Sequence, residues 1–272
     1  MKVLIYDNKE KDKDKIYFNQ LISLLNNNKI EYKQLEDCDL CGKEDADAIF
    51  TLGGDGTILW LVEFANRNSI PIIGINAGKL GFLSEFETAE MEEAVSLFKD
   101  GLLKKDERLT LQVSINGETF HALNDAYIQR LYSKEIGCMT ADIAVSIGGS
   151  RVERFKGDGV VVSTPTGSTA YSLSAGGPVI SPDIDALSVT PIAAHALGHR
   201  TIVFSSDKKC CLELVGKAHG GLFVDGRLIA EIKKGDLVFI DSAKNKTIFL
   251  RRKEFNFFKR LSVKLKDSLD VE

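Results

Sequence analysis

The pentapeptide Gly53-Gly54-Asp55-Gly56-Thr57 decides how the first part of this chain is expected to fold. It follows an apolar run at 48–52, typical of a buried strand, and it precedes an apolar-rich stretch at 58–64 that suits a packed helix. Glycines tolerate positive φ and let a ligand approach the backbone, while the free N–H groups at a helix start attract anions. A carboxylate in such a cradle would be a magnesium ligand or a base for a hydroxyl. A plain strand–helix turn with Asp55 as N-cap is equally consistent with the pentapeptide.

Bulk composition indicates a globular protein with no broad attraction for polyanions. The chain has 272 residues, 44% of them hydrophobic, and a formal net charge of −4. This length accommodates one large domain or two ordinary ones, and the negative charge favours partners other than nucleic acid or anionic membrane. The first residues lack the apolar core of a signal peptide, and no apolar stretch is long enough to span a bilayer. We therefore expect a soluble, cytoplasmic protein.

The cysteines and histidines do not form a recognisable metal site. Five cysteines, an odd number, disfavour a disulfide framework. Cys38 and Cys41 have redox or metal spacing, but no second pair follows, so two free thiols in a loop are the favoured interpretation. His195 and His199 are four residues apart, yet the glutamate of a zinc-protease motif is missing. We predict no direct protein ligands for a metal.

Alternating strands and helices in the first part of the chain predict an α/β domain with a Rossmann-like parallel sheet. Buried strands are expected at 2–6, 30–35, 48–52 and 70–75, with helices at 16–26 and after Thr57. The segment from Asn76 to Gly81 follows the last of these strands, where ligands of open α/β sheets collect, so we expect it to face a ligand. It matches neither the Walker A pattern nor G-x-G-x-x-G. We assign residues 1–105 to this domain.

Beyond residue 105 the pattern changes to short alternating strands separated by turn dipeptides. Asn116-Gly117, Gly148-Gly149 and Asp225-Gly226 are hairpin signals. We predict a mainly antiparallel β domain over 106–250. The tail at 251–272 is expected to be a helical piece that packs back on the first domain.

Three polar stretches of the second part are candidates for ligand binding. Asn124 and Asp125 offer donors and acceptors suited to the vicinal hydroxyls of a ribose, although turns use the same residue types. Lys156 would meet a phosphate and Asp158 an amide or amine, although an edge strand with alternating charges has the same appearance. The run from Thr164 to Pro178 combines hydroxyls, small residues and Tyr171, which suits stacking on a base; a flexible loop is the alternative.

Taken together, these motifs resemble the NAD kinase family, which has a GGDG motif, an Asn-Glu pair and a TPTGSTAYSLSAGGP-type run in this order. The likeness covers most of residues 48–226. It implies transfer of a phosphoryl group from ATP to the 2′-hydroxyl of the adenosine ribose of NAD, with Asp55 as the base, Mg²⁺ as the divalent ion and a homo-oligomer, dimer or tetramer, completing the NAD pocket. The resemblance assigns the phosphate cradle to Gly53, Gly54, Gly56 and Thr57. It assigns NAD binding to Asp55, Gly56, Asn124, Asp125, Lys156, Asp158, Thr169, Ala170, Tyr171, Ser172, Leu173, Ser174 and Ala193.

The sequence departs from the family pattern at three places. Asp125 replaces the glutamate of the pair and is one methylene shorter. Lys156 stands where the family often has arginine and loses the bidentate fork, and Trp60 stands where many relatives have a basic residue. A lipid or sugar kinase shares the GGDGT motif, but it has no use for a dinucleotide-binding run. A non-catalytic NADP(H)-binding sensor is the other alternative, and the intact Asp55 argues against it.

Overall fold

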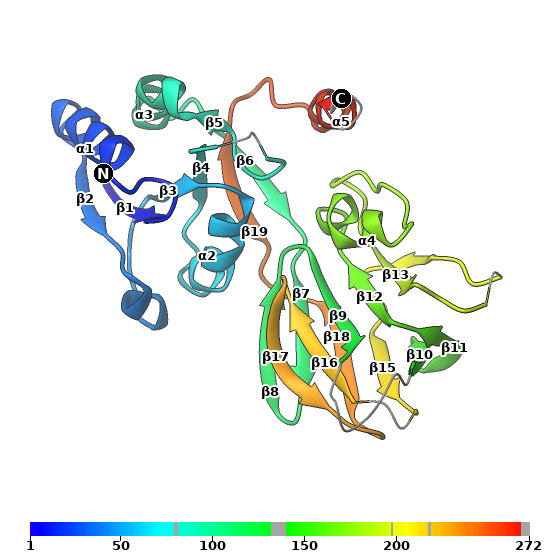
Figure 1. Ribbon diagram of the computed structural model, residues 1–272. Helices are drawn as coiled ribbons and strands as arrows, with labels where there is room; N and C mark the ends of the chain where they lie inside the picture. The colour runs from blue at the N-terminus through cyan, green and yellow to red at the C-terminus, as the bar shows by residue number, and fades with distance from the viewer. Residues whose placement is uncertain (79–80, 132–139, 197, 217–218, 268–272) are drawn as a thin grey trace. The chain divides into compact units, whose positions relative to one another are not determined.

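The computed structural model describes residues 1–78, 81–131, 140–196, 198–216 and 219–267 (Figure 1). The chain divides into two compact units: the first comprises Met1–Glu107 and Thr247–Glu272, and the second comprises Arg108–Lys246. The sequence had suggested that the second part runs to residue 250. The chain instead re-enters the first unit at Thr247, because its last strand pairs with a strand of the first sheet.

The first unit is built on one seven-stranded sheet with strand order β2-β1-β3-β4-β19-β6, and β5 pairs with β4. β1 pairs in parallel with β2 and β3, and β4 pairs in parallel with β3, β5 and β19. The strands are β1 (Lys2–Asp7), β2 (Glu31–Gln34), β3 (Ala48–Gly53), β4 (Ile72–Asn76), β5 (Phe86–Glu87), β6 (Lys104–Arg108) and β19 (Thr247–Arg251). β3 and β4 are buried along their whole length, as central parallel strands must be.

Helices cover both faces of this sheet. α1 (Ile16–Asn27) and α3 (Met91–Lys99) bury Phe18, Leu21, Val95 and other apolar side chains against one face, in one core with β1, β3 and β4. α2 (Asp55–Asn68) buries Ile58 and other apolar residues that lie outside this core, on the opposite face. The last helix of the unit, α5 (Phe257–Asp267), comes from the tail. The short 3₁₀ helices are η1 (Asp37–Cys41) and η2 (Thr88–Glu90).

The second unit consists of two six-stranded sheets around a single apolar core. One sheet has the order β11-β10-β15-β18-β7-β8 and the other β14-β13-β12-β9-β16-β17. The first sheet contains β7 (Leu111–Ile115), β8 (Glu118–Ala122), β10 (Ala141–Ile147), β11 (Ser150–Gly157), β15 (Cys210–Leu214) and β18 (Leu237–Ser242). The second contains β9 (Asp125–Arg130), β12 (Gly159–Ser163), β13 (Ala186–Ile192), β14 (Ile202–Ser205), β16 (Gly220–Val224) and β17 (Arg227–Ile232). Both sheets are antiparallel, which confirms the predicted β-rich architecture.

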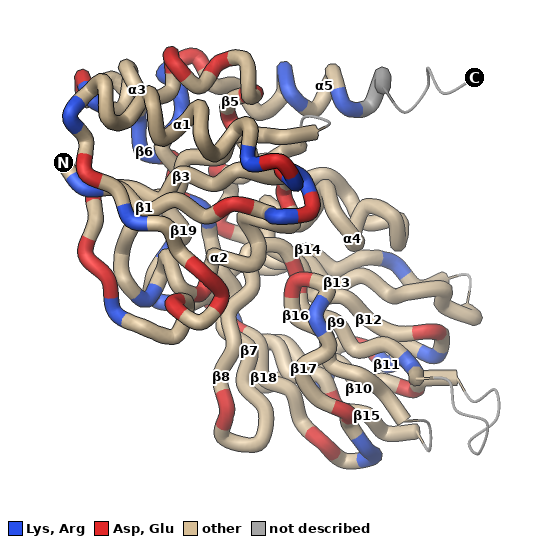
Figure 2. The backbone as a smooth tube through the Cα atoms, turned by 60° about the vertical axis from the view of Figure 1, so that its left-hand side comes forward, with Lys and Arg blue, Asp and Glu red and all other residues tan. Residues whose placement is uncertain are grey.

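Charge is spread over both units. Acidic and basic residues are interspersed along the backbone in Figure 2, in keeping with a net charge of −4. Among the described residues, no helix has both the length and the apolar character that crossing a membrane requires.

Candidate active site

The turn between β3 and α2 carries the predicted glycine cradle. Gly54 is the N-cap of α2 in an extended conformation, with φ −103° and ψ −170°, and the helix begins at Asp55. The glycines of this turn do not adopt positive φ, so their role is to leave space rather than to reverse the backbone. A Cβ on Gly53 would meet the hydroxyl oxygen of Thr57 at 2.2 Å, whereas Gly54 and Gly56 have no neighbour within 4 Å of such an atom. The turn is therefore packed at Gly53 and open at the helix start.

The carboxylate of Asp55 accepts hydrogen bonds from a second backbone turn. The N–H groups of Phe82 and Leu83 donate to it at 2.7 and 3.1 Å, and that of Ser84 lies at 3.4 Å. An ideal Cβ on Gly81 would lie only 2.0 Å from Oδ1 of Asp55, so the carboxylate rests directly on the Gly81 backbone. Asp55 is thus fixed in orientation at the mouth of the glycine turn.

A cavity of about 320 Å³ opens beside the start of α2. The residues that line it come from the ends of β1 and β2, the segments after them, and the first turns of α2. They are Tyr6, Asp7, Asn8, Lys9, Glu10, Leu35, Glu36, Asp37, Gly56, Thr57 and Trp60. The side-chain amide of Asn8 donates to the Thr57 hydroxyl at 3.0 Å, which ties the β1 loop to the cradle. Trp60, which stands where many relatives have a basic residue, lines this cavity with its aromatic ring. The cavity is large enough for part of a nucleotide.

The hydroxyl-rich run of the second unit forms a tight loop around η3 (Gly167–Thr169) and α4 (Tyr171–Ser174). Several of its hydroxyl groups hold the loop itself. The Thr164 hydroxyl donates to the Leu123 carbonyl at 2.6 Å, and the Ser168 hydroxyl donates to the Pro165 carbonyl at 2.6 Å.

Within the predicted NAD-binding stretch, exposure differs from residue to residue. Ser172 is fully buried, and its hydroxyl is paired with that of Thr190 at 3.2 Å. Its side chain therefore has a structural use that the sequence did not indicate. Five neighbours keep some accessible surface: Thr169, Ala170, Tyr171, Leu173 and Ser174.

Asn124 and Asp125 stand at the start of β9 and are held by a residue that the sequence analysis assigned only to a hairpin turn. The carboxylate of Asp225 accepts hydrogen bonds from the backbone N–H groups of Leu123, Asn124 and Asp125 at 2.8, 2.9 and 3.1 Å. Asp225 adopts a positive φ of 45° in the turn after β16, which aspartate tolerates better than most residues. The pair is thus presented by a carboxylate 100 positions away in sequence.

Asp125 is a buried carboxyl group, only 4% exposed. Its burial, and the nearby Asp225 carboxylate, raise its pKa to about 7, although the backbone N–H of Tyr171 opposes the shift. Burial likewise raises the pKa of Asp225 to about 6, against the opposing effect of its three N–H donors. Beside Asp125, the Tyr127 ring stacks on Phe223 at 4.8 Å and meets the Tyr171 ring edge-on at 4.9 Å. Tyr171 is therefore part of an aromatic cluster.

The Lys156–Asp158 segment lies beside Ala193. The backbone N–H of Asp158 donates to the Ile192 carbonyl at 2.9 Å, and a Cβ on Gly157 would meet the Ala193 carbonyl at 2.7 Å. The structure thus brings these predicted site residues together. Asp158 has a protein partner that the sequence analysis missed, since Nη2 of Arg130 lies 2.8 Å from its carboxylate. Lys156 is exposed, with its Nζ 3.9 Å from Asp142.

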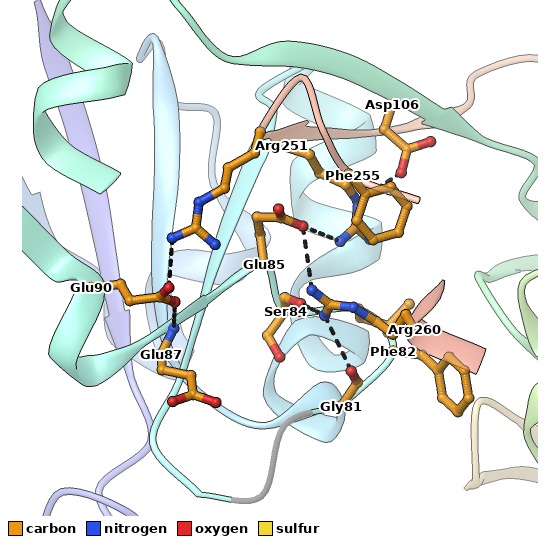
Figure 3. Close-up of polar contacts among 12 residues, drawn as sticks. Gly81, Phe82, Ser84, Glu85, Glu87, Glu90, Asp106, Arg251, Phe255 and Arg260 are labelled. Carbon is orange, nitrogen blue, oxygen red and sulfur yellow. Dashed lines mark hydrogen bonds and ion pairs between the residues drawn. The ribbon is translucent and has the colours of Figure 1, made fainter. Parts of the chain in front are cut away.

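A buried ionic network lies next to the turn that holds Asp55 (Figure 3). Nη1 of Arg260 on α5 donates to the carbonyl oxygens of Gly81, at 3.2 Å, and Ser84. Glu85 pairs with Arg260 at 3.6 Å and with Arg251 at 3.2 Å, and Arg251 bonds Asp106 at 2.7 Å. These residues are far apart in sequence and form no motif, so no local signal pointed to them.

In the described part of the chain, no group of three or more His, Cys, Asp or Glu side chains is placed to hold a metal ion. Cys38 and Cys41 are exposed free thiols, and they lie in η1 rather than in an open loop.

An α/β unit with a carboxylate in a glycine turn, followed by a β unit with a hydroxyl-rich loop, defines a two-unit protein suited to phosphate and sugar ligands. Residues 6–102 match the family model of the ATP-NAD kinase N-terminal domain, and residues 123–252 match that of the ATP-NAD kinase C-terminal domain. The NAD kinase of Caldicellulosiruptor bescii is 32% identical over 98% of this chain and 100% of its own length. That of Geotalea daltonii is 37% identical over 82% of this chain and 79% of its own length. The chain belongs to the NAD kinase family.

Two solved structures share the fold. Yeast NADH kinase complexed with NADH has a TM-score of 0.85 at 24% identity, over 100% of this chain and 89% of that one. An Archaeoglobus fulgidus NAD kinase in complex with ATP has a TM-score of 0.81 at 23% identity, over 98% and 99% of the two chains. The resemblance and the fold class expected from the sequence are confirmed.

Proposed function

We propose that this protein is a NAD kinase that transfers the γ-phosphoryl group of ATP to the 2′-hydroxyl of the adenosine ribose of NAD, giving NADP and ADP. Membership of the NAD kinase family supports the reaction class. The observation that carries the mechanism is the Asp55 carboxylate, fixed by backbone N–H groups at an open glycine turn. An alcohol is a weak nucleophile until its proton has an acceptor, and a positioned carboxylate supplies one.

In this mechanism Asp55 accepts the proton of the 2′-hydroxyl as the ribose oxygen attacks the γ-phosphorus. The new O–P bond forms while the bond to the β-phosphate oxygen breaks, and ADP leaves with its electron pair. Gly54 and Gly56, whose Cα atoms have open space beside them, would let the phosphates approach the N–H groups at the start of α2. The cavity beside Thr57 is the place where we expect the rest of ATP to bind.

Magnesium would be held mainly by the ATP phosphates and water. Mg²⁺ in kinases is commonly bound through one or two carboxylates together with substrate phosphates, and the described residues offer no cluster of three ligating side chains. Bound in this way, the ion would neutralise the charge of the transferring group.

In the second unit we assign NAD binding to the surface around Asn124, Asp125 and Asp158, together with the exposed part of the loop at 169–174. The ordered backbone of Asn124 and Asp125 supports a role in holding ribose hydroxyls. Ala193 lies beside Asp158, and exposed Lys156 can reach a phosphate. This assignment requires that the dinucleotide held here reach Asp55, which a crystal structure with NAD would test.

We also propose a cytoplasmic homo-oligomer, dimer or tetramer. ATP and NAD are substrates that the cytoplasm supplies. Exposed apolar side chains on the second unit, such as Val203 and Phe239, are suited to a subunit contact. Light scattering coupled to size-exclusion chromatography measures the assembly, and a monomer at micromolar concentration would contradict it.

The deciding experiment is an assay of NADP formation from ATP, Mg²⁺ and NAD, with other alcohols and lipids as competing acceptors. Asp55→Asn should still bind NAD but lose turnover by about 10²-fold or more, the usual contribution of a general base. Glu63→Gln removes a carboxylate from the same helix, where it pairs with Arg67 on the helix surface, and serves as the control. Ordinary turnover by Asp55→Asn would refute the base assignment.

A further inference from the structure

The four-residue turn from Gly81 to Ser84, referred to here as the base-holding turn, makes hydrogen bonds through both its backbone N–H groups and its carbonyl oxygens. Its N–H groups at Phe82 and Leu83 donate to the Asp55 carboxylate at 2.7 and 3.1 Å. Its carbonyl oxygens at Gly81 and Ser84 accept from Nη1 of Arg260 (Figure 3). The orientation of the N–H groups that fix Asp55 is therefore coupled to the position of one guanidinium group on the last helix.

Arg260 is itself held rigidly. Its side chain is 12% exposed and lies 3.6 Å from the Glu85 carboxylate, which is 4% exposed. Glu85 is shared with Arg251, a fully buried arginine that also bonds Asp106. The ring of Phe255 lies 4.2 Å from the Arg251 guanidinium and 5.3 Å from that of Arg260. Buried charges that are paired and packed in this way keep a single geometry.

Arg252, another arginine of the tail, holds the tail to the rest of the first unit through residues outside the turn that binds Asp55. Arg252 pairs with Glu90 at 2.8 Å and with Glu93 at 2.7 Å, and its guanidinium lies over the Phe86 ring. Among the described residues, these hydrogen bonds, ion pairs and ring contacts of Arg252 all lie outside the base-holding turn. Arg252 forms ion pairs between the start of the tail and the η2–α3 segment, whereas Arg260 donates hydrogen bonds to the turn that holds Asp55. The two arginines therefore allow anchoring and positioning to be separated by mutation.

We propose that Arg260 is a positioning residue for phosphoryl transfer: by holding the carbonyl groups of Gly81 and Ser84, it fixes the N–H groups that orient the Asp55 carboxylate. This inference rests on the proposed role of Asp55 as the base. Its consequence is that the C-terminal helix contributes to the rate of the chemical step without contacting either substrate.

The test compares Arg260→Met, Arg260→Lys and Arg252→Met in the full-length protein. Steady-state kinetics with ATP and NAD, calorimetric NAD binding and thermal unfolding are measured for each. Arg260→Met should lower kcat by about 10- to 100-fold, the cost of a misplacement of about 1 Å, while KM and Kd for NAD stay within about threefold of the parent values. Arg260→Lys keeps the charge but lacks the planar fork that spans two carbonyl groups, so it should recover only part of kcat. Arg252→Met should lower Tm without this effect on kcat.

A double mutant identifies the route of the effect. If Arg260 acts through Asp55, then Arg260→Met on the Asp55→Asn background should cause no further loss of kcat, because residues that act as a unit are not additive. A full multiplicative loss in the double mutant would overturn the proposal. So would parent-like kcat in Arg260→Met, or a rise in KM for NAD with kcat unchanged.

Failure of the proposed function gives a different pattern. If Asp55→Asn itself turns over normally, the base assignment is wrong, whatever Arg260 does. If Asp55→Asn is inactive and Arg260→Met is parent-like, only the positioning role is wrong. Should Arg260→Met not fold, the kcat of Arg260→Lys decides, since that variant keeps the charge that balances Glu85.

Discussion

Gly81→Ala is the sharpest perturbation that the first unit offers, because it adds one methyl group against the Asp55 carboxylate. An ideal Cβ at this position would lie 2.0 Å from Oδ1, 2.3 Å from Cγ and 2.4 Å from Oδ2 of Asp55. Carbon and oxygen atoms normally approach no closer than about 3.3 Å, so the carboxylate must retreat by about 1.3 Å. The hydrogen bonds from Phe82 and Leu83 are then lost or lengthened.

The displacement predicts a large kinetic effect and a modest effect on stability. A misplacement of about 1 Å costs about 10²-fold in rate, and we expect kcat to fall by that factor. Partly exposed Asp55 can regain water, so the free energy of unfolding should fall by only about 1–3 kcal/mol. NADP formation and thermal unfolding are measured side by side with Gly198→Ala in the second unit. A Cβ on Gly198 would meet no atom within 4 Å, and no site role is assigned to this glycine, so its kcat should stay within about threefold of the parent. A folded Gly81→Ala protein with kcat as high as that of the control would refute the assigned geometry of the base.

Three further substitutions test carboxylates whose environments the structure defines. Asp7 is 7% exposed, and both its side-chain oxygens lack a partner among the described residues; burial raises its pKa from 3.8 to about 6. A raised folded-state pKa means that stability is lost as pH rises from about 4 to about 6. At pH 8, Asp7→Asn should therefore raise Tm and increase the free energy of unfolding by at most about 3 kcal/mol, and this gain should vanish toward pH 4. A lower Tm of the variant at pH 8 would contradict the argument. Because the pKa of Asp125 is about 7, its carboxylate becomes protonated below that pH, and KM for NAD should rise about three- to tenfold as pH falls from 8 to 6. Asp125→Asn should flatten this dependence of KM on pH. An unchanged pH dependence in the variant would exclude Asp125 as its cause. Asp225→Asn keeps the turn but gives three N–H donors a neutral acceptor. We therefore expect the free energy of unfolding to fall by about 1–3 kcal/mol and KM for NAD to rise. Parent-like values of both quantities would show that the three hydrogen bonds contribute neither to stability nor to NAD binding.

The parts of this protein that local sequence could predict are those in which neighbouring residues determine the structure. A buried strand, a glycine turn and an apolar helix start follow one another at Gly53, and the structure has β3 and α2 there. Alternation with hairpin dipeptides likewise predicted the antiparallel sheets of the second unit. The hydroxyl-rich run was recognised by its residues, but its polarity did not tell which hydroxyls hold the loop. Ser172, expected to face a ligand, is bonded to Thr190 on β13.

What the sequence did not reveal depends on contacts between distant segments. Asp225 was visible as a hairpin turn, yet its carboxylate serves Asn124 and Asp125, about 100 positions earlier. β19 adds a strand to the first sheet after the whole second unit has been completed. Arg260 and Ser84 are separated by 176 positions. Charged residues in a tail are usually solvated, so no pattern marks the one that is buried, and only the fold shows which carbonyl groups it meets.

Asp55 can hold a turn and still act as a base, because a carboxylate has more acceptor capacity than the turn uses. An ionised carboxylate offers about four lone-pair sites. Phe82 and Leu83 occupy one on each oxygen, and the longer contact from Ser84 shares Oδ1. Among the hydrogen bonds made by the described residues, at least one site on Oδ2 therefore remains for the proton of a sugar hydroxyl. Its direction is fixed by the same N–H groups that hold the carboxylate, so any change that moves the turn should redirect that lone pair and slow proton transfer while NAD is still bound.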